Sequence, residues 1–318
     1  MYAQPHLLTG LWTRFAARHL FDYNTAATRL WLVIVACGFA VAAWSVFRLA
    51  QAVPEQWMAF ALGTALAVFA GMVPVRIPRT KTSFSVSDLF IFYLLISQGP
   101  AAAILAAGVE GALGAYRTSK RLTSRLSTPA AAMVGFAAAG LVLELCRHGL
   151  APWLRPQVAD MVGVCIAALL PFICTTLPLT SVLALKQGRK VSLAQWWSQC
   201  SWFGAIYLGS AMAAAIGHMN TMQFGASALV AAVAVVFAVI MLLRVSLDKQ
   251  EAEHQAQEVR LQAAQREAEL GQLRFTASFT HAGVGMAIVD PAGKVVQVNK
   301  ALCRLLKSVE PAMVGQPF

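Results

Sequence analysis

The sequence predicts an all-α polytopic membrane bundle of about eight transmembrane helices, then a helical coiled-coil connector and an incomplete α+β domain. Hydrophobic residues make up 58% of the 318 residues and charged residues only 12%, against about 25% charged residues in an ordinary globular protein. The apolar residues fall in long runs, and the net charge of +11 arises entirely before Asp248. This composition excludes a disordered chain and an ordinary soluble enzyme. Because the basic residues punctuate apolar runs, we expect no nucleic-acid partner.

Eight apolar runs are the candidate membrane spans. A helix needs about 20 apolar residues to cross about 30 Å of hydrocarbon, and seven runs approach that length. The eighth, Val86–Ser97, is shorter and precedes the turn signal Gln98-Gly99-Pro100, so it is either a short span or a re-entrant segment. The seven longer runs are Leu30–Leu49, Trp57–Val75, Ala101–Tyr116, Pro129–Cys146, Val158–Leu185, Ser201–Met219 and Phe224–Leu243.

The basic residues between these runs predict the orientation. If all eight runs cross and the N-terminus is cytoplasmic, fourteen basic residues lie inside, and only Arg48, Arg147 and Arg155 lie outside. This distribution satisfies the positive-inside rule. We therefore expect a multi-pass protein of the inner membrane, surrounded by lipid, with both termini cytoplasmic. Residues 1–29 are then a cytoplasmic leader and residues 30–244 the transmembrane domain.

Residues 245–277 form the predicted connector. The segment lacks proline, has helix-forming residues and alternates charge signs, and small or apolar residues follow a four–three spacing typical of a parallel coiled coil. Most of these positions are alanine, which buries little surface, so the association is weak. The segment is either a homodimeric connector that can change register or a solvated single helix. The seam consists of Ala252, Ala256, Val259, Ala263, Leu270, Leu273 and Ala277.

Residues 278–318 begin a small α+β unit. Met286–Val289 and Val295–Val298 are predicted strands joined by a turn over residues 290–293. Asn299 is a predicted helix N-cap. The leucines after it are expected to form one apolar face: Leu302, Leu305 and Leu306.

The motif running through this unit resembles the opening of a PAS domain. The resemblance covers Phe275 to Phe318 and follows the sequence Gly285-Met-Ala-Ile-Val-Asp290, then Gly293, then Val298-Asn299-Lys-Ala-Leu302. It implies a domain of which less than half is present. The PAS ligand cleft is formed mostly by later residues, so no cofactor is assigned.

The membrane part resembles the membrane-associated sensor (MASE-type) input domains of bacteria. The similarity lies in Ser83–Phe92, in Gly99-Pro100 with the alanines that follow, and in Gly108–Gly111. It implies an input role, homodimerisation and no catalytic residues in the membrane part. It also implies a cytoplasmic output outside this sequence, such as c-di-GMP synthesis or hydrolysis or a histidine kinase.

Acidic residues inside a bilayer mark candidate sites because burying their charge is costly. Glu110 is either a ligand or proton site or a structural partner of a neighbouring span, and we expect Gly108, Gly111 and Gly114 to let a helix approach closely. We interpret Asp88 chiefly as a first-turn acid at the start of a helix. Asp88 also stays a ligand-sensing candidate.

Three further residues are sensing candidates. Pro171 and Pro178 interrupt one long apolar run. They either create a binding site at mid-depth in the membrane or cause a simple kink whose backbone carbonyls accept hydrogen bonds from threonine hydroxyls. His218 could sense pH or bind a metal, although a single interfacial histidine usually does neither. No cysteine or histidine spacing predicts a metal site.

The sequence therefore predicts a membrane sensor that passes a stimulus of unknown nature through the connector to the PAS segment. Two alternatives stay open. One is a small-molecule transporter or a substrate-binding membrane subunit, and the other is a membrane anchor without a ligand.

Overall fold

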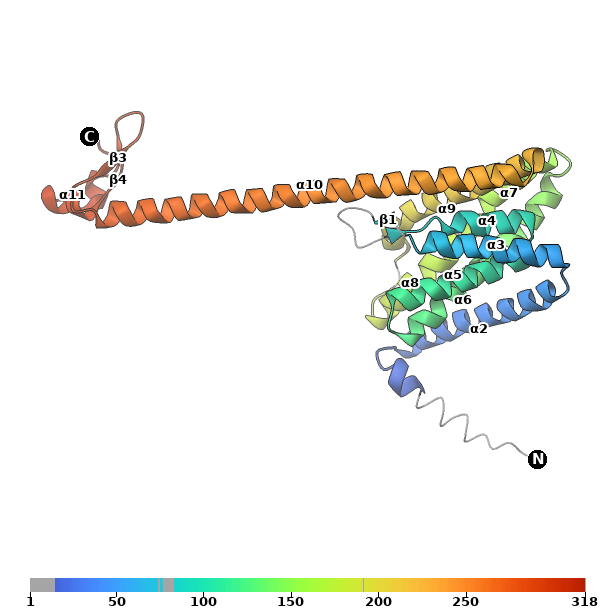
Figure 1. Cartoon of the computed structure of the whole chain (residues 1–318). Coiled ribbons are helices and arrows are strands. Elements are labelled where there is room, and N and C mark those ends of the chain that lie inside the picture. The colour runs from blue at the N-terminus through green and yellow to red at the C-terminus, as the bar shows by residue number, and fades with distance from the viewer. Residues whose placement is uncertain (1–14, 74, 77–82, 191, 318) are drawn as a thin grey trace. The chain divides into compact units, whose positions relative to one another are not determined.

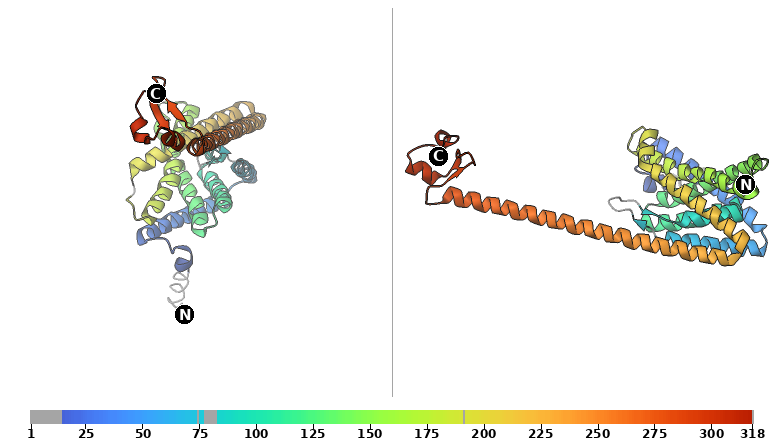
Figure 2. Two further views of the ribbon diagram at one scale, coloured as in Figure 1. Left: turned by 90° about the vertical axis from the view of Figure 1, so that its left-hand side faces the viewer. Right: turned by 90° about the horizontal axis from the view of Figure 1, so that it is seen from above.

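The computed structural model describes residues 15–73, 75–76, 83–190 and 192–317, and it divides into two compact units, Met1–Arg244 and Val245–Phe318. Figures 1 and 2 show the helices of the first unit running side by side. Eight helices whose bounds the structure gives lie wholly in this unit: α2 (Thr25–Ala50), α3 (Pro54–Gly71), α4 (Ser87–Ser97), α5 (Pro100–Thr118), α6 (Leu122–Leu150), α7 (Pro156–Ala167), α8 (Leu169–Lys186) and α9 (Leu193–Phe224). A two-stranded antiparallel pair, β1 (Val75–Arg76) and β2 (Ser83–Phe84), connects α3 to α4.

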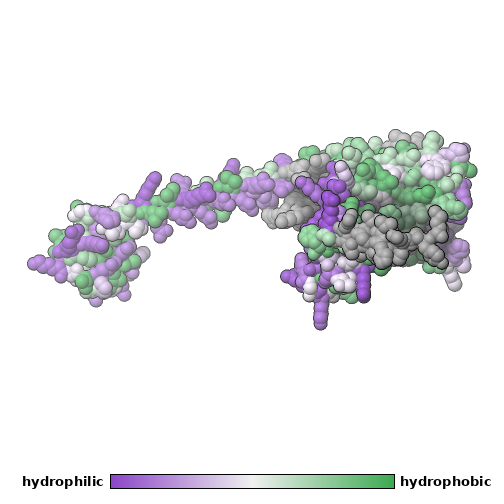
Figure 3. All heavy atoms as spheres, turned by 90° about the horizontal axis from the view of Figure 1, so that it is seen from below, coloured by the Kyte–Doolittle hydropathy of each residue, from purple (hydrophilic) through white to green (hydrophobic). Residues whose placement is uncertain are grey.

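Four helical segments are long and apolar enough to cross a membrane, among the residues that the structure describes. They are Thr25–Ala50, Leu122–Leu150, Pro156–Lys186 and Leu193–Phe224. On α2, for example, the side chains of Val33, Phe39 and Phe47 are each more than half exposed, and so continuous an apolar surface is typical of contact with lipid. In Figure 3 hydrophobic residues cover much of the visible surface of the bundle. The prediction of a helical membrane protein is thereby confirmed.

The short helix α4 lies in the centre of the bundle. Six of its eleven residues are buried apolar side chains, among them Phe92 and Leu95, and it contacts α3, α5 and α9. At 1.5 Å per residue, α4 is about 16 Å long, roughly half of the hydrocarbon thickness. Gly99 adopts a positive φ of 88°, and Pro100 begins α5. The break predicted at Gln98-Gly99-Pro100 is therefore confirmed.

Small residues bring the long helices close together. A Cβ atom at Gly38 of α2 would lie 2.4 Å from the Cβ of Ala130 on α6. The three glycines around Glu110 differ among themselves. A Cβ on Gly108 would meet the side chain of Met133, and one on Gly111 would lie 3.2 Å from the Cα of Pro129, whereas one on Gly114 would meet no described atom within 4 Å. The expected packing role therefore holds for the first two glycines and is wrong for Gly114.

Helix α10 (Ala226–His281) belongs to both units and is 56 residues long. The seam positions predicted from the sequence all lie on this helix and are exposed in the single chain. Hydrophilic residues dominate the part of α10 that belongs to the second unit (Figure 3). The helix ends four residues beyond the predicted end of the connector at Ala277.

The rest of the second unit contains β3 (Ala287–Val289), β4 (Val295–Val298), α11 (Lys300–Leu305) and α12 (Glu310–Met313). The two strands pair antiparallel, which confirms the predicted hairpin. Asn299 is 2% exposed. Its Oδ1 accepts from the backbone N–H groups of Met286 and Leu302, each at 2.9 Å, and its Nδ2 donates to the carbonyl of Val284 at 2.8 Å. The predicted N-cap is thus confirmed, and it also holds the segment before β3.

The expected apolar face after Asn299 is only partly correct. Leu302 is buried with Val295 and Val298 in a small core, but Leu305 is 73% and Leu306 55% exposed. Helix α11 has only six residues, so it is too short to bury a second turn of side chains against a two-stranded sheet.

Candidate functional site

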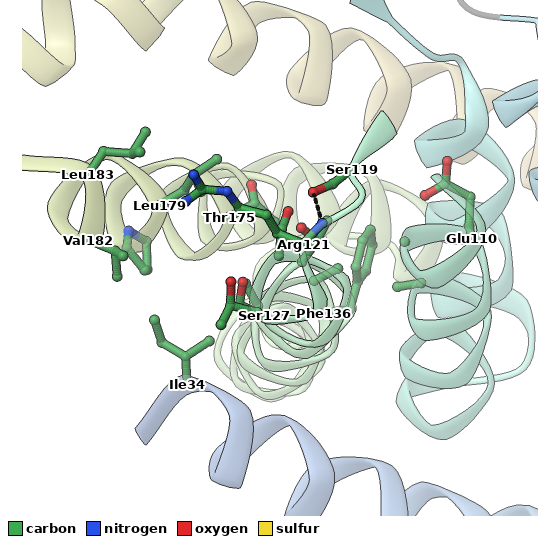
Figure 4. Close-up of a pocket in the computed structure, with 18 of the residues that line it drawn as sticks. Ile34, Glu110, Ser119, Arg121, Ser127, Phe136, Thr175, Leu179, Val182 and Leu183 are labelled. Carbon is green, nitrogen blue, oxygen red and sulfur yellow. Dashed lines mark hydrogen bonds between the residues drawn. The ribbon is translucent and has the colours of Figure 1, made fainter. Parts of the chain in front are cut away.

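One cavity in the bundle has a volume of about 590 Å³ and is lined by residues of α2, α4, α5, α6, α8 and α9. Its apolar lining includes Ile34, Phe136 and Val182. Hydroxyl groups of α6 face it as well, and a volume of this size accommodates a small molecule. In Figure 4 Glu110 lies on one side of α6, and Leu179, Val182 and Leu183 of α8 lie on the other.

Two of the predicted sensing residues, Asp88 and Glu110, line this cavity together. The Ser87 hydroxyl donates to Oε1 of Glu110 at 3.1 Å, and the Ser85 hydroxyl donates to that of Ser87 at 2.9 Å. Gly71 of α3 lies against the same carboxylate, because a Cβ there would be 2.6 Å from Oε1 of Glu110. Asp88 occupies the first turn of α4, as expected. The two acids therefore line one cavity, a proximity that was not predicted from the sequence.

The proline-containing segment contributes a third side to this cavity. The helix breaks between α7 and α8 at Ala168, just before Pro171, since proline cannot donate the hydrogen bond that would continue it. Pro178 and Thr175 line the cavity. The Thr175 hydroxyl donates to the carbonyl of Pro171 at 2.6 Å and lies 3.4 Å from the hydroxyl of Tyr207 on α9. The segment is thus kinked, and a threonine hydroxyl is hydrogen-bonded to its backbone. The same segment also lines the cavity.

Charged groups gather where α2, α6 and α8 meet. Asp22 accepts from Arg121 at 2.6 Å and from Lys186 at 2.7 Å, and both cations line the cavity (Figure 4 shows Arg121). The Lys186 ammonium also lies 4.4 Å from the centre of the Tyr23 ring. The hydrogen bond from Lys186 is the main cause that lowers the pKa of Asp22; burial opposes it, and the hydrogen bond from Arg121 lowers the pKa further. The cavity therefore has cations at one end and carboxylates among its other lining residues.

We expect Asp22→Asn to destabilise the bundle by up to about 1 kcal/mol at neutral pH, because partly exposed ion pairs contribute little. A lowered pKa means that the ionised form is favoured by folding. The contribution is therefore complete above the unfolded pKa, near 4, and is lost as the pH falls through the lower folded pKa. The melting temperatures of the two chains in detergent should converge below pH 4. A difference that persists unchanged at pH 3 would contradict the role of the Asp22 charge.

His218 lies elsewhere, in a cavity of about 200 Å³ between α4, α7 and α9. Its ring makes an edge contact with Tyr93 at 6.0 Å, and its Nδ1 is buried without a hydrogen-bond partner among the residues that the structure describes. Asp160 lines the same cavity. His218 is thus not part of the Asp88–Glu110 site.

Arg147 is the centre of an ion cluster beside this smaller cavity. It donates to Asp160 at 2.6 Å, to Glu144 at 2.8 Å and to the carbonyl of Ile96 at 3.2 Å. The pairing of Glu144 with Arg147 follows from their spacing of one helical turn. Asp160 is thirteen residues away on another helix, and no sequence signal connects it to them.

The residues that sequence reasoning missed are Asp22, Arg121, Lys186, Asp160 and Tyr207. Arg121 and Lys186 appeared only as basic residues that orient the chain. Arg121 is 99 residues and Lys186 is 164 residues away from Asp22 in the sequence, so only the tertiary packing reveals that they pair with it. Tyr207 lies in an apolar run without any distinguishing neighbour.

Comparisons with known proteins give little further information. No family model matches the chain, and no curated protein matches its sequence. A solved structure of the S component of a bacterial ECF transporter is similar over 53% of this chain and 94% of that chain, with 18% sequence identity and a TM-score of 0.37. A similarity this low supports no conclusion about fold or function.

Proposed function

We propose that this chain is the input module of a membrane signalling protein, in which the bundle detects a stimulus and α10 carries the response to the second unit. In this proposal eight segments cross the inner membrane, both termini are cytoplasmic, and residues 278–318 begin a PAS domain. The chain itself is not an enzyme. The output is a cytoplasmic domain outside this sequence, as the resemblance to MASE-type sensors implies.

The length of α10 is the observation that carries this proposal. A membrane crossing takes about 20 residues, whereas α10 has 56. Some 36 residues of the same helix are therefore left for a role outside the membrane, and they include the exposed seam from Ala252 to Leu273. A transporter has no need of such an extension. A weak alanine-rich seam suits a homodimeric connector that has alternative registers of similar free energy.

The cavity with Asp88 and Glu110 is the proposed input site. Its volume of about 590 Å³, its mixed lining and the two acids on neighbouring helices favour a small polar ligand. A ligand shifts a conformational equilibrium only if it binds one state more tightly. Because α4, α5, α8 and α9 all contribute to the lining, a change in the packing of these helices alters the affinity of the cavity for its ligand.

The first test concerns the seam and uses single cysteines in a chain whose six native cysteines are replaced by alanine. We expect Ala256→Cys and Ala263→Cys to form disulfide-linked dimers in oxidised membrane vesicles. Glu258→Cys and Gln265→Cys, about 200° away around the helix, are the matched controls and should react at least five times more slowly. Equal rates on both faces would contradict the homodimeric connector.

The second test asks whether the cavity controls the seam. We expect Ser127→Phe, which fills the cavity, to change the cross-linking rate of Ala263→Cys at least twofold. Leu141→Phe, at a 69% exposed position outside this cavity, should leave the rate unchanged. If the dimer stays intact and Ser127→Phe leaves its cross-linking rate unchanged, the sensor proposal is overturned and a simple membrane anchor is favoured.

A transporter or substrate-binding subunit is the second candidate, favoured by a cavity of mixed lining that is lined in part by α8, which follows the helix break at Ala168. Uptake of labelled small solutes by reconstituted vesicles distinguishes it. A sensor is expected to give none above protein-free vesicles, and uptake that Glu110→Gln abolishes would establish transport instead.

A further inference from the structure

The smaller cavity beside His218 has an unusual set of lining side chains. Three methionines, Met161 of α7 and Met219 and Met222 of α9, line it together with His218. His218 and Met222 are four residues apart and therefore share a face of α9. Because α7 contacts α9 directly, Met161 comes to the same cavity from the facing helix. Three thioether side chains and one imidazole therefore line one cavity, with Met222 at its exposed edge (70% exposed).

The histidine has an unused nitrogen there. Its Nδ1 is buried and has no hydrogen-bond partner in the described part of the chain, although buried polar groups are normally bonded. The edge contact with the Tyr93 ring limits the movement of the imidazole, and the Tyr93 hydroxyl lies 3.3 Å from that of Thr221. A neutral imidazole held in this way is a good metal ligand.

The donor atoms select the class of ion. Thioethers are soft ligands that favour Cu(I), whereas Zn²⁺ and harder ions need thiolates, imidazoles or carboxylates. The described residues contain no cluster of three or more His, Cys, Asp or Glu suited to such ions. Next to the cavity, Arg147 is bonded to both Glu144 and Asp160, so the cluster has one excess negative charge. A monovalent cation neutralises it.

We propose that His218, Met161, Met219 and Met222 form a binding site for Cu(I), or for another soft monovalent ion of the same chemistry such as Ag(I). In the proposed orientation this end of the bundle faces the outside of the inner membrane. The site is separate from the Asp88–Glu110 cavity and does not depend on the sensor proposal.

The experiment measures Cu(I) binding by the purified full-length chain in detergent, with all six cysteines replaced by alanine, by competition with a chromophoric Cu(I) chelator. We expect one equivalent to bind. The double variant Met219→Leu/Met222→Leu keeps the apolar volume and should bind at least tenfold more weakly, as should His218→Ala. Met212→Leu, which lines a neighbouring cavity, is the matched control and should bind normally.

X-ray absorption of the loaded chain supplies a second readout, with sulfur scatterers expected and their number reduced in the double variant. If the cysteine-free chain fails to fold, the intact chain and its double variant are compared, and the double variant should bind one equivalent less. Binding that is absent in the parent chain, or unchanged in the double variant, would overturn the proposal and leave the methionines as packing residues.

Discussion

Gly38→Ala is expected to destabilise the membrane bundle by about 3 kcal/mol, at the upper end of the usual range for overpacking. The new Cβ would lie 2.4 Å from the Cβ and 2.5 Å from the Cα of Ala130. Neither atom can move without its backbone, so α2 and α6 must separate. These helices also meet where the Trp31 indole donates to the carbonyl of Thr123 at 3.0 Å, and we expect that bond to lengthen. Thermal unfolding in detergent measures the loss.

Gly114→Ala is the matched control for this variant. It makes the same chemical change inside another bundle helix, α5, where a Cβ meets no atom of the described residues within 4 Å. Alanine has the higher helix propensity, by up to about 1 kcal/mol, so this variant should be as stable as the parent or slightly more stable. If both variants lose the same stability, close packing of α2 on α6 does not explain the effect.

The sequence allowed the helices and their breaks to be predicted because these depend on neighbouring residues. Apolar runs mark helices in a bilayer, and Gln98-Gly99-Pro100 ends one helix and begins the next. The hairpin before Asn299 is likewise local, since its turn and its cap lie within a few residues. Whether each apolar helix faces lipid or protein depends on tertiary packing and is not predictable from neighbouring residues. Apart from Ser87, Asp88 and Ser97, the segment Val86–Ser97 is apolar, and nothing in its sequence shows that α4 is surrounded by other helices.

The candidate site was only partly predictable for the same reason. The cost of an acid in the membrane singled out Asp88 and Glu110 individually. Their common cavity depends on the contact between α4 and α5, which carries the bond from Ser87 to Glu110. The methionines beside His218 carried no signal either, since methionine is an ordinary apolar residue in a membrane helix. Only the approach of α7 to α9 adds Met161 to them.

Arg147→Met is expected to destabilise the bundle by about 2 kcal/mol. Breaking a buried ion pair typically costs 3–5 kcal/mol, because one charge is left without a partner, and the smaller value follows from partial exposure. The Arg147 side chain is 28% exposed and that of Asp160 25%. The substitution leaves two carboxylates and the carbonyl of Ile96 without their donor, so α4, α6 and α7 lose the group that joins them. Thermal unfolding in detergent measures the change.

Two further variants separate this effect from a general loss of positive charge. Arg155→Met changes an exposed residue that precedes α7, and we expect its stability to stay within about 0.5 kcal/mol of the parent. The triple variant Glu144→Gln/Arg147→Met/Asp160→Asn removes the stranded charges and should recover part of the loss, because neutral amides cost less to bury than carboxylates. A triple variant less stable than Arg147→Met alone would show that the guanidinium acts by packing, and not by compensating the two acids.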